Sequence, residues 1–262
     1  MSTLRNQTWL LLGASGGIGR AILAGLLERG ARVLVAGRHP EALADQFAGD
    51  QVVPVRLDLN SEQLGMSLQD LITTQGLPDG VIHCAGINQF GAMEASTDSL
   101  LSNMLNVNLR SPMVLARELV PAMRERGAGS LVFVGSTFGS IGFPGYSAYC
   151  ASKFGLRGFV EALRRELADS PLAILYMAPR ATCTAMNDAQ VNAMNKDLGN
   201  HMDSPERVAS AIFRAMDRGN ASLYLGWPEK LFVRINALWP RLVDRALRKQ
   251  LPVIQQYLHK GA

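Results

Sequence analysis

Residues 9–19 read WLLLGASGGIG, an apolar run that passes directly into a glycine-rich turn, and a helical pattern follows at once. Glycine permits positive φ and close approach of the backbone to a ligand, and a helix N-terminus offers free N–H groups to a phosphate. The spacing Gly13, Gly17, Gly19 is GxxxGxG, which is neither GxGxxG nor the GxxxxGK[ST] loop of nucleoside-triphosphate sites. The turn therefore predicts a dinucleotide site after the first strand. A strand-to-helix turn without a ligand is the alternative.

Short β-rich runs alternate with helical patterns along the rest of the chain, which predicts an α/β fold. A longer helical pattern over 97–126 contains Pro112 and Pro121, which predict a break, a kink or a helix start. Ser204 and Pro205 form a helix start, as cap and first residue. Strands are expected at 9–12, 32–36, 51–57, 80–83, 130–134, 173–177 and 222–225, and the other helices at 18–29, 40–47, 61–73 and 148–168.

This order predicts a single-domain Rossmann-type doubly wound parallel sheet with helices on both faces. Residues 1–226 are expected to form the dinucleotide-binding domain with the catalytic site. Residues 227–262 are expected to form a basic, amphipathic C-terminal helical extension that is not an independent domain.

The composition is that of a globular protein and excludes several classes. The chain has 262 residues, of which 48% are hydrophobic and 18% charged, and no apolar run approaches the roughly 18 residues of a membrane-spanning helix. Three cysteines without CxxC spacing and four scattered histidines predict neither disulfides nor a metal site. The apolar stretch at 9–12 is too short for a signal-peptide core, so a cytoplasmic protein is expected.

Positive charge is concentrated in the C-terminal tail. Residues 227–262 contain seven basic and two acidic residues, a net of +5, whereas the whole chain carries +4, so the remainder sums to −1. A nucleic-acid groove needs basic residues across the body of the fold, so no nucleic-acid partner is expected.

The tail also shows helical patterning. Pro240 is expected to begin a second tail helix and Pro252 to end it. Basic amphipathic helices with tryptophan, here Trp227 and Trp239, suit a membrane surface, which predicts peripheral contact at the inner face of the membrane. Packing over the pocket or against a second subunit is the alternative. One apolar stripe, flanked by arginines, comprises Leu231, Ile235, Leu238, Leu242 and Ala246.

The end of the second predicted strand bears on the choice of nucleotide. NAD-binding proteins commonly place an acid here to hold the ribose 2′-OH, but none stands between Arg32 and Pro40. Arg38 can instead pair with a 2′-phosphate, which favours NADP(H) over NAD(H). Asp58, directly after the third strand, can hydrogen-bond an adenine amino group or equally cap the following turn.

The segment from Ser136 to Lys153 holds the candidate chemistry. Tyr149 and Lys153 are four residues apart in a helical pattern, so they lie one turn apart on one face. An ammonium near a phenol is expected to lower the pKa of Tyr149 from its reference of about 10, so that it can exchange a proton near neutral pH. Ser136 follows the fifth strand at the carboxyl edge of the sheet, where its hydroxyl can hydrogen-bond a substrate carbonyl. A solvent-facing Tyr–Lys pair is the alternative.

Taken together, these motifs resemble those of the short-chain dehydrogenase/reductase family over about residues 8–226. GASGGIG at 13–19 resembles the family's TGxxxGxG turn, with Leu12 where threonine is usual. DLN at 58–60 resembles its adenine-contact motif and HCAG at 83–86 its NNAG. Asn108, Ser136, Tyr149 and Lys153 match its catalytic residues.

The resemblance implies a division of labour. NAD(P)H delivers hydride to a carbonyl carbon, and Tyr149 is the general acid or base. Lys153 also binds the nicotinamide ribose, Ser136 polarises the carbonyl, and Asn108 anchors a water in the proton relay. A homodimer or homotetramer is implied as well. The implied nucleotide-binding residues are Gly13, Ser15, Gly17, Ile18, Gly19, Arg38, Asp58, Leu59, Ala85, Gly86, Tyr149, Lys153, Pro179 and Thr184.

Two departures from the family pattern stand out. His83 and Cys84 replace both asparagines of NNAG, which changes local hydrogen bonding. Arg180 stands after Pro179 where glycine is usual; it either receives an acidic substrate group, such as the phosphate of a thioester carrier, or is only a turn residue.

Apolar side chains after the fourth, fifth and sixth strands suggest an apolar carbonyl substrate: a ketone, an aldehyde or a 3-oxoacyl thioester. A place in the core or in a subunit interface is the alternative for each. The expected function is NADPH-dependent carbonyl reduction; a catalytically silent dinucleotide-binding regulator and a sugar-nucleotide epimerase or dehydratase are the alternatives. The candidate pocket residues are Phe90, Phe138, Phe143, Tyr146, Met186 and Met194.

Overall fold

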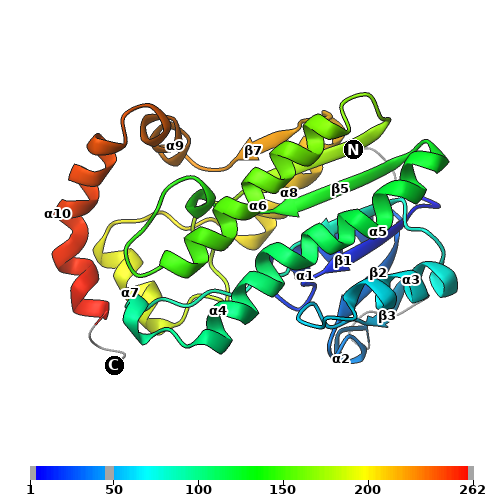
Figure 1. Ribbon diagram of the computed structural model, residues 1–262, viewed down its shortest axis with the longest axis horizontal. Coiled ribbons are helices and arrows are strands. Elements are labelled where there is room, and N and C mark those ends of the chain that lie inside the picture. The colour runs from blue at the N-terminus through cyan, green and yellow to red at the C-terminus, as the bar shows by residue number, and fades with distance from the viewer. Residues whose placement is uncertain (1–3, 45–49, 259–262) are drawn as a thin grey trace.

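One parallel sheet organises the molecule. The computed structural model describes residues 4–44 and 50–258. Within them, seven strands pair in parallel in the order β3-β2-β1-β4-β5-β6-β7, and helices cover both faces (Figure 1). The predicted Rossmann-type doubly wound fold is therefore confirmed. The strand order reverses between β1 and β4, and open α/β sheets bind ligands at the carboxyl ends of the strands beside such a reversal.

Each predicted strand is present, with bounds that agree to within one residue at either end. The central strands are apolar and buried on both faces, as parallel strands between two helical layers must be. The strands are β1 Thr8–Leu12, β2 Arg32–Gly37, β3 Val52–Arg56, β4 Gly80–His83, β5 Gly129–Val134, β6 Leu172–Ala178 and β7 Ser222–Tyr224.

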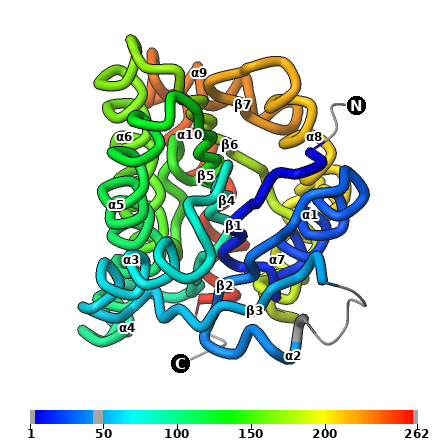
Figure 2. Tube along the Cα trace, turned by 90° about the vertical axis from the view of Figure 1, so that its right-hand side faces the viewer, coloured from blue at the N-terminus to red at the C-terminus, as the bar shows by residue number. Residues whose placement is uncertain are grey.

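Alternate residues of the strands supply two cores. Leu10, Leu12 and Leu34 point to the layer formed by α3 Leu64–Gln75, α5 Ser111–Arg126 and α6 Ser147–Glu166. Trp9, Leu11 and Val33 point to the opposite layer, formed by α1 Gly17–Glu28 and α8 Pro205–Asp217. Figure 2 shows these two layers on either side of the sheet. The short helix α2 covers Glu41–Ala44, and residues 45–49, part of the helix expected at 40–47, lie outside the described residues.

The pattern over 97–126 divides into three pieces. Helix α4 spans Asp98–Leu105, a π-helical turn η2 spans Asn106–Arg110, and α5 follows with Pro112 in its first turn. Pro112 is thus at a helix start, whereas Pro121 lies inside α5. The wider π turn carries the Asn108 side chain into the interior, where it is fully buried.

The segment after β6 contains a helix that the sequence did not predict, α7 Ala189–Asp197, capped by Asp188. Helix α8 then begins as predicted, since Ser204 Oγ accepts a hydrogen bond from Arg207 N at 3.2 Å and Pro205 follows. Two single 3₁₀ turns, η1 Met93–Ala95 and η3 Thr137–Gly139, lie after β4 and β5.

The C-terminal tail forms two helices, α9 Glu229–Leu238 and α10 Pro240–Leu258, at the carboxyl side of the sheet beside α7 (Figure 1). Pro240 begins α10 as predicted, but the prediction that Pro252 ends it is wrong. Pro252 is solvent-exposed, so water can satisfy the carbonyl that loses its partner, and burial of Ile254 and Tyr257 stabilises the helix beyond it.

The predicted apolar stripe of the tail does not face the body of the protein. Leu238 and Leu242 are 67% and 50% exposed, and Trp239 between them is 61% exposed. The tail packs instead through Val233, Val243 and the C-terminal half of α10. No helix among the described residues is both long and apolar enough to span a membrane.

Candidate active site

A cavity of about 310 Å³ opens at the carboxyl ends of β1, β4, β5 and β6, within the size range of ligand sites. It joins the glycine turn after β1 to the segments after β5 and β6 and to the first turns of α6. The predicted residues that line it are Gly13, Ser15, Gly17, Ile18, Gly19, Gly86, Ser136, Phe138, Phe143, Tyr146, Tyr149, Lys153, Pro179, Thr184, Met186 and Met194.

Six predicted residues do not line this cavity. Ala85 lies under the glycine turn, Asn108 is buried behind the site, and Phe90 packs on Tyr146 with ring centroids 5.2 Å apart. The other three, at the outer ends of β2 and β3, are Arg38, Asp58 and Leu59.

The glycine turn is packed backbone against backbone. Gly13 has φ +85°, and an added Cβ there would lie 2.5 Å from Ala85 N. An added Cβ at Gly19 would lie 2.0 Å from Gly13 O, so the helix starts in contact with the strand. No side chain caps the N-terminus of α1, because the cap residue is Gly16. The turn therefore fits a dinucleotide pyrophosphate, which these amides and the positive end of the helix dipole favour.

The Tyr149 phenol stands at the aromatic side of the cavity, with Tyr146 and Phe138 at ring-centroid distances of 6.0 and 6.4 Å. Burial raises the pKa of Tyr149 to about 12, and a hydrogen bond with the Ser136 side chain acts in the opposite direction. The expected lowering of this pKa is thus wrong for the structure. Desolvation is the largest influence on this pKa, although the Lys153 Nζ lies 5.7 Å from the Tyr149 ring centroid.

Lys153 is the most deeply buried cation of the site, with 4% of its surface exposed. Its Nζ donates a hydrogen bond to Val134 O at 3.2 Å, at the end of β5. Burial lowers the pKa of Lys153 to about 8, while the nearby Cys84 acts in the opposite direction. The ammonium is therefore held in the charged form at neutral pH but close to its titration.

The Asn108 side chain makes three hydrogen bonds within the protein. Its Oδ1 accepts from Ile87 N at 2.9 Å, and its Nδ2 donates to Ile87 O at 2.8 Å and to Ser152 Oγ at 3.0 Å. One lone pair of Oδ1 remains for another donor. An added Cβ at Gly86 would lie 3.4 Å from both Asn108 Oδ1 and Lys153 Nζ. Both atoms thus border one glycine, an arrangement compatible with a shared water.

His83 has a structural contact that the sequence did not predict. Its Nε2 lies 2.7 Å from Ser111 Oγ, and that hydroxyl donates to Val107 O at 2.8 Å, so Nε2 is the donor to Oγ. Burial, together with the Lys153 charge, lowers the pKa of His83 to about 3 and keeps it neutral. The histidine thus ties β4 to the π turn that carries Asn108.

The neighbouring Cys84 lines the cavity. Burial raises the pKa of its thiol to about 12, so it stays protonated at neutral pH. Among the described residues, no group of three or more His, Cys, Asp or Glu could hold a metal ion.

At the outer edge, Arg38 is exposed directly after β2. Asp58 Oδ1 accepts a hydrogen bond from Asn60 N at 2.9 Å, so this carboxylate caps the turn, the alternative considered above. Leu57 N donates to Gly37 O at 2.8 Å, which places the turns after β2 and β3 side by side.

Comparison with known proteins identifies relatives of the whole arrangement. The family model of the short chain dehydrogenases matches residues 7–195. An uncharacterized oxidoreductase, YxnA, of Bacillus subtilis is 30% identical over 95% of this chain and 73% of its own length. The ketoacyl reductase HetN of a Nostoc species is 31% identical over 95% of this chain and 90% of its own.

Solved structures share the fold. A short-chain dehydrogenase from Streptomyces avermitilis has a TM-score of 0.79 at 30% identity and covers 93% of this chain and 97% of its own. Two Burkholderia structures, at 23% and 20% identity, have TM-scores of 0.80 and 0.81 and cover 94% and 92% of this chain, and 98% and 96% of their own. One is a complex with NADP and the other with NAD, so this fold accommodates either nucleotide.

The packing of the glycine turn generates a prediction. Gly13→Ala should lower dinucleotide affinity by at least about 100-fold, because the new methyl group would collide with the Ala85 backbone at a residue of positive φ. Binding can be followed by quenching of protein fluorescence. Gly158→Ala on α6, whose added Cβ meets nothing within 4 Å, is the matched control and should bind normally. Equal affinity in both variants would contradict the assignment of this turn.

Proposed function

The chain belongs to the short-chain dehydrogenase/reductase family and is an NAD(P)-dependent oxidoreductase, and we propose that it uses NADPH to reduce an apolar ketone, aldehyde or 3-oxoacyl thioester. The observation that supports this proposal most strongly is that a single cavity is lined by the glycine turn and by Ser136, Tyr149 and Lys153. A catalytically silent regulator has no need of these three groups around one cavity. In this proposal residues 1–226 hold the nucleotide and the chemistry, and residues 227–262 are an extension of the same unit.

The nicotinamide nucleotide, when bound, supplies or accepts the hydride, and the residues of the chain manage the proton. Tyr149, protonated at neutral pH, gives its proton to the carbonyl oxygen, and in the oxidative direction it takes a proton from the alcohol. Ser136 holds the same oxygen by a hydrogen bond. Lys153 stabilises the phenolate that is left behind and then passes a proton back to it. Asn108 anchors the water through which Lys153 regains that proton from solvent.

The nucleotide would lie along the glycine turn towards the outer ends of β2 and β3. Gly13, Gly17 and Gly19 are the close contacts to its pyrophosphate, and Arg38 pairs with the 2′-phosphate. The exposed position of Arg38 directly after β2 supports this pairing. Asp58 caps its turn through Oδ1, which accepts a hydrogen bond from Asn60 N. Its other oxygen, Oδ2, would accept a hydrogen bond from the adenine amino group.

The substrate side of the cavity is aromatic. Phe138 and Phe143 stack with centroids 5.0 Å apart, and Tyr146 lies 5.3 Å from Phe138. Such a wall favours the apolar part of a carbonyl compound. The similarity to the ketoacyl reductase of Nostoc supports 3-oxoacyl thioesters as the first class to assay.

Assembly and location complete the proposal. A homodimer or homotetramer is supported by exposed apolar side chains on one helical layer, Leu105 beside η2, Met113 on α5 and Phe154 on α6. The protein is proposed to work in the cytoplasm, in peripheral contact with the inner face of the membrane.

The membrane contact would be made by the elbow, defined as residues 238–245, where α9 meets α10. Its exposed apolar residues Leu238, Trp239 and Leu242 share a shallow groove with Arg241 and Arg245. Apolar side chains that insert at the headgroup level and cations that attract anionic lipids are the combination expected of an interfacial helix.

The catalytic assignment is tested by Tyr149→Phe. Loss of the general acid should reduce turnover by about 100-fold or more. Nucleotide affinity should stay within about twofold, because the glycine turn and Lys153 still hold the pyrophosphate and the ribose when the single Tyr149 hydroxyl is lost. NADPH consumption with a carbonyl compound that the native enzyme reduces is followed optically. Near-normal turnover by the variant would refute the role of Tyr149.

The nucleotide assignment is tested by titrating NADPH and NADH. The native protein should bind NADPH about 10-fold to 100-fold more tightly, the scale of a charge-assisted pair, and Arg38→Asp should reverse much of that preference through like-charge repulsion. Arg124→Asp, near the end of α5, makes the same charge change beside the amino end of β5. It lies at the edge of the sheet opposite to the nucleotide site and serves as control. Equal native affinities for the two nucleotides would overturn the preference.

The membrane assignment is tested by sedimentation with vesicles containing an anionic lipid. The native chain should bind at low salt and dissociate at high salt, since each basic residue near the surface contributes about 1 kcal/mol that salt screens. Trp239→Glu combined with Leu242→Glu should abolish binding. Met66→Glu, at an exposed residue of α3, is the matched control. If the native chain does not sediment at low salt, the tail serves packing alone.

A further inference from the structure

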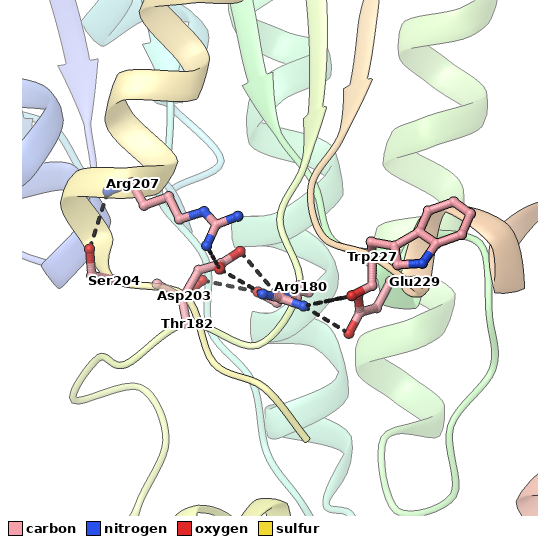
Figure 3. A network of polar contacts seen from close by, with 7 residues as sticks. All are labelled: Arg180, Thr182, Asp203, Ser204, Arg207, Trp227 and Glu229. Atoms are coloured by element: carbon pink, nitrogen blue, oxygen red, sulfur yellow. Dashed lines mark hydrogen bonds and ion pairs between the residues drawn. The ribbon is translucent and has the colours of Figure 1, made fainter. Parts of the chain in front are cut away.

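Arg180 is the centre of an ion-pair network beside the active site (Figure 3). It stands two residues after β6 and lines the catalytic cavity. Its Nε and Nη2 donate to the two oxygens of Asp203 at 3.1 and 2.9 Å, which is a two-pronged pairing. Its Nη1 donates to Glu229 Oε2 at 3.2 Å and to Trp227 O at 3.4 Å. One guanidinium thus joins the segment after β6, the segment before α8 and the start of α9.

The charges of this network balance. Arg180 and Arg207 face Asp203 and Glu229, two cations against two anions, and Arg207 Nη1 lies 3.4 Å from Asp203 Oδ1. The Asp203 side chain is only 1% exposed, so its charge depends on these partners. The guanidinium therefore already pairs with two carboxylates of the protein, Asp203 and Glu229. The expectation that Arg180 receives an acidic substrate group finds no support in this pairing. It is also more than a turn residue.

The backbone connects Arg180 to the catalytic segment. Thr137 N donates to Pro179 O at 3.0 Å, directly after Ser136. Asp203 is fixed on the other side, because its N–H donates to Ala181 O and its carbonyl accepts from Cys183 N, both at 2.9 Å. A shift of Arg180 would thus be transmitted to the residues that hold Ser136 and to the segment that leads to Thr184.

The C-terminal extension is attached at two further places. Asn236 Nδ2 on α9 donates to Ser140 O at 2.9 Å. On α10, Ile254 and Tyr257 are buried in the same cluster as Tyr146 and Cys150, against which Tyr149 packs. The extension therefore spans the site from Arg180 to the aromatic wall, and its elbow faces solvent.

We propose that the C-terminal extension is one wall of the substrate pocket and that Arg180, acting through Glu229 and Asp203, is the positioning residue that sets the distance of this wall from the catalytic tyrosine. The apolar part of the substrate would then contact the aromatic cluster, which Ile254 and Tyr257 of α10 support from behind, while Glu229 of α9 lines the cavity itself. Loss of the Arg180–Glu229 link would loosen the wall without altering the proton-transfer groups. The proposal rests on the carbonyl reduction proposed above only for its kinetic readout.

The test is hydrogen–deuterium exchange and steady-state kinetics on the full chain for Glu229→Gln, which removes one charge from a partly exposed side chain and should leave the fold intact. Amides of α9 should exchange at least about threefold faster in the variant. For a carbonyl compound that the native enzyme reduces, KM should rise about tenfold while kcat stays within about twofold, the pattern of lost ground-state binding. Arg180→Lys keeps the positive charge but loses the two-pronged guanidinium pairing with Asp203. Its α9 exchange rates and its KM should lie between those of the native chain and those of Glu229→Gln.

Glu161→Gln is the matched control, since it cuts an exposed Glu–Arg pair with Arg165 on α6. Hydrogen–deuterium exchange is measured without substrate. If no carbonyl substrate is found, that failure counts against the proposed reaction, and the exchange rates still test the link between Arg180 and α9. If Glu229→Gln matches Glu161→Gln in both exchange and KM, the positioning role is overturned. Faster exchange with an unchanged KM would also overturn it, because the extension would then not be a wall of the pocket.

Discussion

The burial of the Lys153 ammonium is the constraint on which the site depends. Helix α6 carries this cation to the end of β5, where one backbone carbonyl receives it and almost no solvent reaches it. Such a charge is costly, and the folded pKa of about 8 lies below the ordinary 10.5. As pH rises, the folded state therefore releases this proton first, and the free energy of unfolding increases between about pH 8 and 10.5. The neighbouring side chains add no second charge beside this ammonium: His83 stays neutral and Cys84 stays a thiol. Asn108 Oδ1 borders Gly86, as Lys153 Nζ does.

The C-terminal extension separates two roles along its length. Its ends are tied to the catalytic unit, through Glu229 at one end and through Ile254 and Tyr257 at the other. Its elbow keeps Leu238, Trp239 and two arginines in solvent. A partner at the elbow, such as the lipid surface proposed above, would thus act on the helices that pack against the catalytic unit.

Local patterns predicted much of the fold and part of the site. The strands and the glycine turn follow from short apolar runs and residue spacing, and the helical spacing of Tyr149 and Lys153 placed them on one face. The features that the sequence did not predict depend on distant contacts. The raised pKa of Tyr149 results from burial, the Arg180 network joins residues up to 49 positions apart, and α10 continues past Pro252 because Ile254 packs on the aromatic cluster. Spacing along the chain carries no information about desolvation or about which distant side chain will be the partner.

Direct titration of Lys153 by NMR tests the central claim of a desolvated lysine at the catalytic centre. The chain has five lysines, so isotope labelling of the side-chain amines gives few signals to assign. We predict that one lysine titrates near pH 8 and that its signal is absent from Lys153→Met. If Lys153 instead titrates at the reference value of a solvated lysine, about 10.4, its ammonium is not desolvated and the site is not built as described.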